Sequence, residues 1–325
     1  MTVTVEQADQ EFLDAACLAL RAPREGGDPL DALGWWDLLG ELADRDARMA
    51  ALALFRAQGR ELATSAALGA LMAQPFLAAT GHAPGSLVAA INHRSRRRGE
   101  RLIVIGDVAG RSLLVDRPGQ GAGVVDADRV GLRPREGAGR LALHEVELDP
   151  SAWAPTVAES HASPARARGQ FLGRLALAWE ILGAAEGALA LAVAHAATRE
   201  QFGKPIGTFQ AVRHLLAWAK TDCVALESVA VTAARLDEAT PPRHDEVVKA
   251  LAGRNGRRAC ERALQVLGAI GFTAEHSHHH FHSRVLALDA LLGTSAELTH
   301  ALGGWVRQTR ADLAVDAAAL LASPQ

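Results

Sequence analysis

The sequence predicts a mainly α-helical protein with a small β-domain between two helical regions. Two observations support this: apolar residues recur at helical spacing on both sides of a central stretch, and strand-like runs occur only inside it. We therefore expect an N-terminal helical domain (1–74), a middle β-domain (75–155) and a C-terminal four-helix bundle (156–325).

The N-terminal region is rich in alanine and leucine. Apolar residues follow a helical period in three segments, 6–20, 31–43 and 46–71. Gly26-Gly27-Asp28-Pro29 separates the first two segments, because glycine and proline interrupt regular helices. The predicted structure is a small helical domain.

The middle region contains the strand-like runs, at 102–105, 113–115, 124–125 and 141–148. The last run alternates apolar and polar residues, as a strand with one buried face does. The short basic run Arg94 to Arg98 precedes the first of them and is interpreted as a solvated strand end.

The C-terminal region returns to long helical periodicities, broken at Pro241-Pro242. Apolar residues recur at three- and four-residue steps as far as Ala196, so Arg199 is expected in the last turns of a long helix. Gly203 and Pro205 then end that helix.

The composition predicts a large apolar core and gives no indication of a nucleic-acid partner, a disulfide framework or a zinc site. The chain has 325 residues, 49% of them hydrophobic, and a net charge of −3, which offers no electrostatic case for nucleic acid. Three scattered cysteines suggest neither a disulfide framework nor a zinc site. The first residues lack the pattern of a secretory signal and no run is read as membrane-spanning, so a cytoplasmic location is expected.

Two segments of the C-terminal region carry recognisable chemistry. The first is REQFGKPIGTFQ at 199–210, where a guanidinium and an amide at a helix end suit a pyrophosphate and hydrogen-bonding edges. The second is QVLGAIGFTAEH at 265–276, where small residues let a backbone approach a phosphate-bearing ligand closely.

Both segments resemble motifs of the acyl-CoA dehydrogenases, R-x-Q-F-G-x-P-I-x-x-F-Q and Q-x-x-G-G-x-G-[YF]-T-x-E-H, with Ala269 replacing one glycine. The resemblance implies an oligomer in which these segments contact the FAD of a neighbouring subunit. Arg199, Gln201 and Phe202 would face the pyrophosphate and adenine, with Phe209 and Gln210 nearby. Gln265, Val266, Leu267, Gly268 and Ala269 would form the other wall, and Thr294 matches a flavin-contacting threonine of the family and also suits a helix cap.

The family's catalytic base is missing. Its usual glutamate aligns with Leu292, and the alternative position on an earlier helix aligns with Gly173. Neither residue can accept a proton, so no catalytic residue is assigned to this chain. Glu180 and Glu275 are the carboxylates that a self-sufficient enzyme would have to use instead.

The resemblance also implies a shortened β-domain, because the family's flavin-lining Thr/Ser-Glu-x-x-x-Gly-Ser-Asp and Trp-Ile-Thr/Ser segments are absent. The nearest remnant, Ala79 to Ser86, is not assigned to flavin. The N-terminal V-P-E-x-x-G-G loop is absent too.

With both FAD-contacting motifs present, and the base and the flavin-lining segments absent, the chain resembles the short subunit of heterotetrameric (α2β2) acyl-CoA dehydrogenases. These enzymes are known from actinobacterial sterol side-chain degradation. The resemblance implies a half-site subunit that shares FAD with a full-length paralogue holding the carboxylate, for α,β-dehydrogenation of an acyl-CoA thioester such as a steroid side-chain CoA. The electron acceptor stays unassigned. Two alternatives remain open: a self-sufficient homo-oligomeric dehydrogenase with an unrecognised base, and a non-enzymatic scaffold subunit.

Five histidines crowd the second motif, at 276, 278, 279, 280 and 282. Their spacing could gather imidazoles around a metal. The family pattern already places a histidine-containing turn here, so a polar surface is the preferred interpretation and no metal is assigned.

Overall fold

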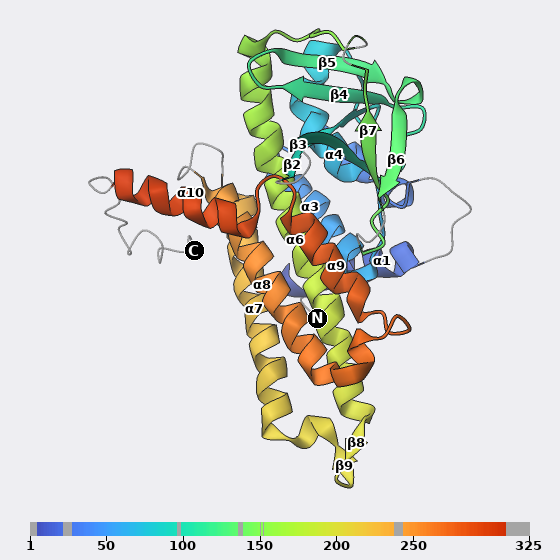
Figure 1. The fold of residues 1–325 in the computed structure, drawn as a ribbon, viewed down its shortest axis with the longest axis vertical. Coiled ribbons are helices and arrows are strands. Elements are labelled where there is room, and N and C mark those ends of the chain that lie inside the picture. Colours follow the sequence, from blue (N-terminus) through green and yellow to red (C-terminus); the bar gives the residue numbers. More distant parts are fainter. Residues whose placement is uncertain are drawn as a thin grey trace.

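A long helical bundle forms the axis of the molecule, and the β-domain covers one of its ends (Figure 1). The computed structural model describes residues 5–21, 28–95, 99–135, 139–149, 151, 153–236 and 243–309. The N-terminal helices pack against both parts. One apolar core is shared by the N-terminal helices and the bundle, and a second fills the β-domain.

The N-terminal region contains α1 (Val5–Arg21), α2 (Trp35–Leu38), α3 (Arg45–Glu61), α4 (Ala67–Ala73) and α5 (Leu77–Thr80), with short 3₁₀ turns at Asp31–Leu33 and Gln74–Phe76. Helix α3 begins at Asp44, whose carboxylate accepts the N–H groups of Asp46 and Ala47 at 3.0 and 2.9 Å. The continuous helix predicted over 46–71 is wrong. It ends at Glu61 because Leu62 takes a left-handed conformation, with φ of 54°.

Helix α3 crosses the bundle helix α6 (Glu159–Thr198) at two glycines. A Cβ added at Gly59 would lie 2.0 Å from the carbonyl oxygen of Glu180, and one at Gly183 would lie 1.9 Å from that of Arg56. The two backbones therefore touch, and no side chain larger than hydrogen fits between them.

The β-domain contains two sheets (Figure 1). One has the order β1 (Leu87–Ala89), β4 (Ser112–Arg117), β5 (Gly121–Asp126), with β1 parallel to β4. The other has the order β2 (Ile91–Ser95), β3 (Gly99–Ile105), β7 (Leu143–Glu147), β6 (Gly131–Arg135), all antiparallel. Apolar side chains of both sheets, including Val88, Val104 and Leu113, fill the space between them.

The four predicted runs lie in β3, β4, β5 and β7, whereas β1, β2 and β6 were missed. Strand β6 has the sequence GLRPR and no apolar alternation. It pairs only with β7, so Pro134 sits on an edge strand, where the missing N–H costs no ladder bond. The last three residues of the basic run, 96–98, lie outside the described residues.

Helices α6, α7 (Gln210–Arg235), α8 (His244–Leu267) and α9 (His278–Asp289) form the bundle, as predicted, and α10 (Ser295–Gln308) extends away from it (Figure 1). A hairpin of β8 (Glu200–Gln201) and β9 (Lys204–Pro205) and a 3₁₀ turn at Ile206–Thr208 join α6 to α7. A second 3₁₀ turn, Gly268–Phe272, follows α8.

Helix α6 is long and apolar enough to cross a membrane, by length and composition alone. The expectation that no run reaches that length is therefore wrong. In the folded chain 78% of its most apolar stretch is buried, because α6 is the central helix against which α3, α7, α8 and α9 pack. The cytoplasmic location stays a prediction.

Candidate functional site

The first motif forms the turn at the far end of α6 (Figure 1). Arg199 is the residue after the helix, and its N–H donates to the carbonyl of His195 at 2.8 Å. The carbonyl of Arg199 accepts the N–H of Ile206 at 2.7 Å, which closes the β8–β9 hairpin. Arg199 thus follows the last turn that was predicted to contain it.

Phe202 stands at the tip of this hairpin with 93% of its surface exposed. Its φ is 53° and that of Gly203 is 75°, so a bulky residue occupies a left-handed conformation that costs about 1–3 kcal/mol. Its ring meets the edge of Phe209 at 6.1 Å, and the ammonium of Lys204 lies 4.6 Å from the Phe209 ring. An exposed, strained aromatic side chain of this kind is typical of a contact surface.

The polar side chains of the motif point away from the core. Gln201 is exposed, and its amide donates only to the carbonyl of Glu200, at 2.8 Å. Within the described part of the chain, the guanidinium of Arg199 makes no ion pair or side-chain hydrogen bond. Both groups can therefore bind a ligand or a neighbouring subunit.

The second motif reaches the same end of the molecule. Burial, then Arg199 and then His276 lower the pKa of His195, so His195 lies within electrostatic reach of residues from both motifs. Gln265 and Ala269 are exposed, and a Cβ at Gly268 would meet nothing within 4 Å. Ile270 and Phe272 are 46% and 76% exposed and add apolar surface at this end.

Some of the predicted FAD-contacting residues do not fit that prediction. The side chains of Val266 and Leu267 belong to the core, with exposures of 6% and 4%, so only their backbone could touch a cofactor. Thr294 lies beyond the other end of α9 (Figure 1). There it caps α10: its hydroxyl accepts the N–H of Glu297 at 3.1 Å, and its own N–H donates to the Glu297 carboxylate at 3.0 Å, which completes a capping box.

The two positions that aligned with the family's base lie side by side in space. A Cβ at Gly173 would stand 2.7 Å from Cδ1 of Leu292, and 2.9 and 3.1 Å from Cγ and Sδ of Met72. Gly173 is on α6, Met72 on α4 and Leu292 on the α9–α10 loop. The apolar side chains of Met72 and Leu292, from two other elements, therefore fill the space that a carboxylate side chain at Gly173 would need.

The loop that carries Leu292 is held from both sides. Arg174 donates to the carbonyl of Leu292 at 3.1 Å and pairs with Asp245 at 2.8 Å. The fully buried Lys249 donates to the carbonyls of Asp289 and Gly293, at 3.0 and 3.3 Å. Burial lowers the pKa of Lys249 to about 8.

Residues 170–320 match the family described as acyl-CoA dehydrogenase, C-terminal domain. The C-terminal half of this chain is an acyl-CoA dehydrogenase C-terminal domain. Acyl-CoA dehydrogenase FadE34 of Mycobacterium tuberculosis is 37% identical over 43% of this chain and 19% of its own length. Acyl-CoA dehydrogenase IpdE2 of the same organism is 33% identical over 39% of this chain and 39% of its own length. The match thus spans under two fifths of either relative.

Solved structures show that the acyl-CoA dehydrogenase fold extends over nearly the whole chain. The Tcur3481-Tcur3483 steroid ACAD G363A variant covers 95% of this chain and all of its own, with a TM-score of 0.72 and 24% identity. The ChsE4-ChsE5 complex of M. tuberculosis has a TM-score of 0.68 at 20% identity, and the match covers 95% of this chain and 100% of that one. Butyryl-CoA dehydrogenase of Megasphaera elsdenii has a TM-score of 0.70 at 15% identity, and the match covers 94% of this chain and 100% of that one.

Glu180, the alternative base of this acyl-CoA dehydrogenase domain, is fully engaged. It is 2% exposed, and one carboxylate oxygen accepts from Arg284 at 2.6 and 2.9 Å while the other accepts from Gln58 at 3.1 Å. A carboxylate that is buried and held on both oxygens in this way is not placed to reach a substrate proton. Glu275 belongs to the second motif and is exposed in the turn before α9.

The histidine cluster forms local bonds around the start of α9. His278 is buried and its Nε2 lies 2.9 Å from the carbonyl of Cys260, while Nδ1 of His279 lies 2.7 Å from that of His276. No group of three or more potential ligands within the described ranges could hold a metal. The three cysteines are free and buried, so the prediction of no disulfide is confirmed.

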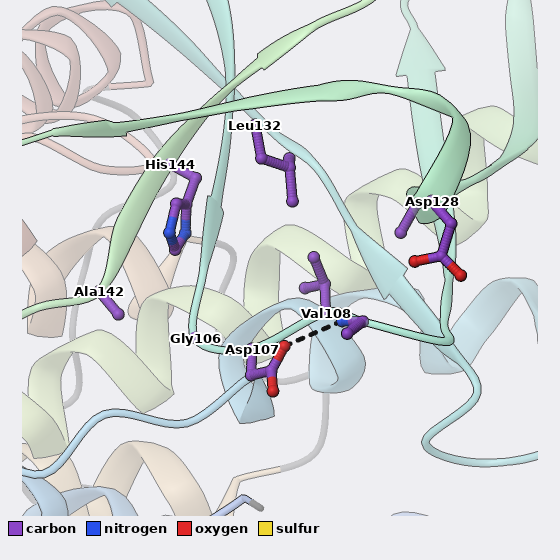
Figure 2. A pocket seen from close by; sticks show the side chains of 9 residues that line it. Gly106, Asp107, Val108, Asp128, Leu132, Ala142 and His144 are labelled. Carbon is purple, nitrogen blue, oxygen red and sulfur yellow. Dashed lines mark hydrogen bonds between the residues drawn. The ribbon is translucent and has the colours of Figure 1, made fainter. Parts of the chain in front are cut away.

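The β-domain contains a pocket of 350 Å³ that the sequence did not indicate (Figure 2). Asp107 accepts the N–H of Ala109 at 3.0 Å, and Asp128 that of Gly110 at 3.4 Å, so both carboxylates hold the loop that borders the pocket. The buried Nδ1 of His144 on the opposite wall has no partner in the described part of the chain. Strand and loop patterns predict neither the loop geometry nor this opening.

Proposed function

We propose that this chain is the base-lacking subunit of an FAD-dependent acyl-CoA dehydrogenase that introduces an α,β double bond into an acyl-CoA thioester. The FAD is shared with a paralogous subunit that holds the catalytic carboxylate. The observation that carries the proposal is the contact of Gly173, Leu292 and Met72, because neither aligned position carries a base and the space beside Gly173 is filled.

General-base catalysis requires a carboxylate close to the substrate, and this chain offers none in a suitable position. A general base must lie within about 3 Å of the α-proton that it removes. Glu180 is committed to Arg284 and Gln58, and Glu275 lies within the second motif, at the opposite end of α9 from Leu292. The carboxylate must therefore come from another subunit.

The residues at the free end of α6 fit a dinucleotide cofactor. The first motif offers a guanidinium and an exposed amide, and the second offers Gly268, where a Cβ would meet nothing within 4 Å and a ligand can approach the backbone closely. The bound flavin supplies the hydride acceptor, and the protein supplies position and electrostatics. The guanidinium of Arg199 would bind the pyrophosphate through two parallel hydrogen bonds.

The other residues of this end would shape the cofactor site. Phe202 and Phe209 would pack against the adenine side, Gln201 and Gln210 would serve its hydrogen-bonding edges, and Gln265 would close the opposite wall. Phe202, Phe272 and Ile270 together form the apolar surface on which the partner subunit would rest. Removing that surface from water would compensate for the strained backbone at Phe202.

Two of the similar structures support a proposal for the substrate class. One similar structure is named as a steroid ACAD, and two are complexes of paired subunits. The two-sheet domain of this chain is small, which leaves room at the partner's site for a fused-ring acyl-CoA such as a steroid side-chain CoA ester.

Co-expression tests the proposal. The chain is produced alone and together with a full-length acyl-CoA dehydrogenase paralogue from the same genome, and flavin absorbance is measured per chain. We expect colourless protein alone and one FAD per pair in the complex. Yellow protein with turnover from the chain alone would instead establish a self-sufficient enzyme, and a complex that keeps its flavin without Arg199 would establish a scaffold.

A further inference from the structure

Arg199 is accompanied by two histidines at the end of α6 that carries the first motif. His195 lies one helical turn before it, and the carbonyl of His195 accepts the N–H of Arg199 at 2.8 Å. His276 belongs to the second motif, in the turn before α9. Arg199 and His276 both act electrostatically on His195, so three basic side chains from two segments gather at this end.

The imidazole of His195 is open to a ligand. Within the described ranges its two ring nitrogens make no hydrogen bond and no ion pair, and the only bonds of His195 are made by its carbonyl. The side chain is half-buried, and neither nitrogen is sealed from solvent. A bound molecule can therefore reach the ring.

The surroundings of His195 favour its neutral form. Burial is the largest cause that lowers its pKa, followed by Arg199 and His276. Glu200 and Glu275 stand next in sequence to these two basic residues, but neither is among the groups that act on His195. No carboxylate of the described ranges therefore holds a proton on this ring.

His276 is oriented by the backbone around it. Its Nδ1 accepts the N–H of His278 at 3.2 Å, and its carbonyl lies 2.7 Å from Nδ1 of His279. A neutral ring that accepts at Nδ1 carries its proton on Nε2. The turn therefore presents Nε2–H as a hydrogen-bond donor without requiring a charge.

An anion bound among these three groups would reverse the balance at His195. A nearby negative charge favours the protonated form of a histidine, whereas the present neighbours disfavour it. The pyrophosphate of the proposed FAD is the anion that this end of the molecule would meet, because Arg199 is the residue that we assign to it.

On the basis of the proposed shared FAD, we propose that His195 completes the pyrophosphate site with Arg199 and His276 and takes up a proton from solvent when the cofactor binds. The imidazolium then donates a charged hydrogen bond to a phosphate oxygen. The affinity for FAD rises as the pH falls, and it levels off once His195 is protonated in the free complex as well.

Calorimetry counts the proton. The flavin-depleted complex with the paralogue is titrated with FAD at about pH 6.5, the ordinary pKa of histidine, in two buffers of different ionisation enthalpy. We expect the wild type to take up a fraction of a proton per FAD and His195→Gln to take up none. His161→Gln is the control, because it removes an exposed histidine at the opposite end of α6 and should keep the uptake.

The pH dependence of the affinity separates a contact from a structural role. His195→Gln should weaken FAD binding about tenfold at about pH 5.5, as the loss of a charged hydrogen bond does, and little at about pH 8.5. A purely structural effect would be equal at both. His195→Asn provides a second neutral replacement if the glutamine variant does not assemble.

A wild type that takes up no proton, or variants of His195 that still take it up, would overturn the proposal. Arg199→Ala in the same titrations distinguishes this failure from that of the proposed function. Unchanged affinity in Arg199→Ala would refute the shared FAD site itself. Lost affinity in Arg199→Ala, with no proton uptake by the wild type, would refute only the role of His195.

Discussion

Arg199 shows how one residue can be placed from the sequence although the described ranges contain no ion-pair partner for its side chain. Helical spacing predicted the end of α6, and the structure places Arg199 there as the first residue after the helix. No acid within the described ranges pairs with it, so its role depends on another molecule.

Replacing Arg199 tests that role. In the complex with the paralogue, Arg199→Ala should weaken FAD on the order of tenfold to a hundredfold, the usual effect of losing a charged hydrogen bond. Arg199→Lys should restore part of the affinity, since an ammonium keeps the charge without the two-point geometry. Arg129→Ala, which removes an exposed guanidinium in the β-domain, is the control. Fluorescence titration with FAD gives the dissociation constants, and unchanged values would disprove the contact.

Lys249 should make the free energy of unfolding depend on pH in the alkaline range. Its pKa in the folded chain is lowered to about 8 from 10.5, so above pH 8 the unfolded chain binds more protons and stability rises with pH. The buried cysteines oppose this from about pH 9, because burial raises the pKa of Cys17 to about 11 and that of Cys223 to about 12.

The rise should therefore appear between about pH 8 and 9. Urea unfolding at closely spaced pH values measures it, with Lys249→Met as the variant that should lose it. If the two proteins show the same slope in that window, Lys249 is not the titrating group.

At the scale of elements, the crossing of α3 and α6 is set by glycine rather than by apolar pattern. Gly59 and Gly183 let the two backbones touch, and this contact brings α3 close enough for Arg56 to reach α6 and α7. Periodicity predicted both helices, but it contains no information about which faces meet.

Gly183→Ala should therefore destabilise the fold. The added methyl would stand 1.9 Å from the carbonyl of Arg56, so the helices must separate, at a cost of about 1–3 kcal/mol or more. Gly303→Ala on α10 is the matched control: nothing lies within 4 Å, and alanine should stabilise that helix by about 0.5–1 kcal/mol. Chemical denaturation of both variants checks the sign of each change, and a neutral Gly183→Ala would contradict the packing argument.

At the scale of the whole molecule, the two motifs lie at one end of the bundle, while the positions that align with the family's base lie at the other end of α9. The resemblance predicted that Leu292 and Gly173 stand where members of the family carry a base. It could not show that these two positions touch each other and Met72, because they lie more than a hundred residues apart and meet only through the packing of α6 against α4 and the α9–α10 loop.

Restoring a carboxylate in this chain should consequently not restore catalysis. Leu292→Glu, paired with a paralogue whose own base has been changed to glutamine, should show no acyl-CoA oxidation, because Met72 and the α6 backbone occupy the space beside it. The same variant paired with an intact paralogue should keep its activity and so prove assembly. Turnover in the first pairing, measured with an artificial electron acceptor, would mean that the site can open.

By itself the sequence determined the fold class, the order of helical and β regions, and the two motifs, because these depend on local periodicity and on residue identities at short spacing. The tertiary structure decided the rest. It divided the predicted 46–71 helix, paired the polar strands β2 and β6, buried Val266 and Leu267, and placed Thr294 at the far end of α9. These outcomes depend on contacts between distant segments, whose energies follow from packing and not from any local pattern.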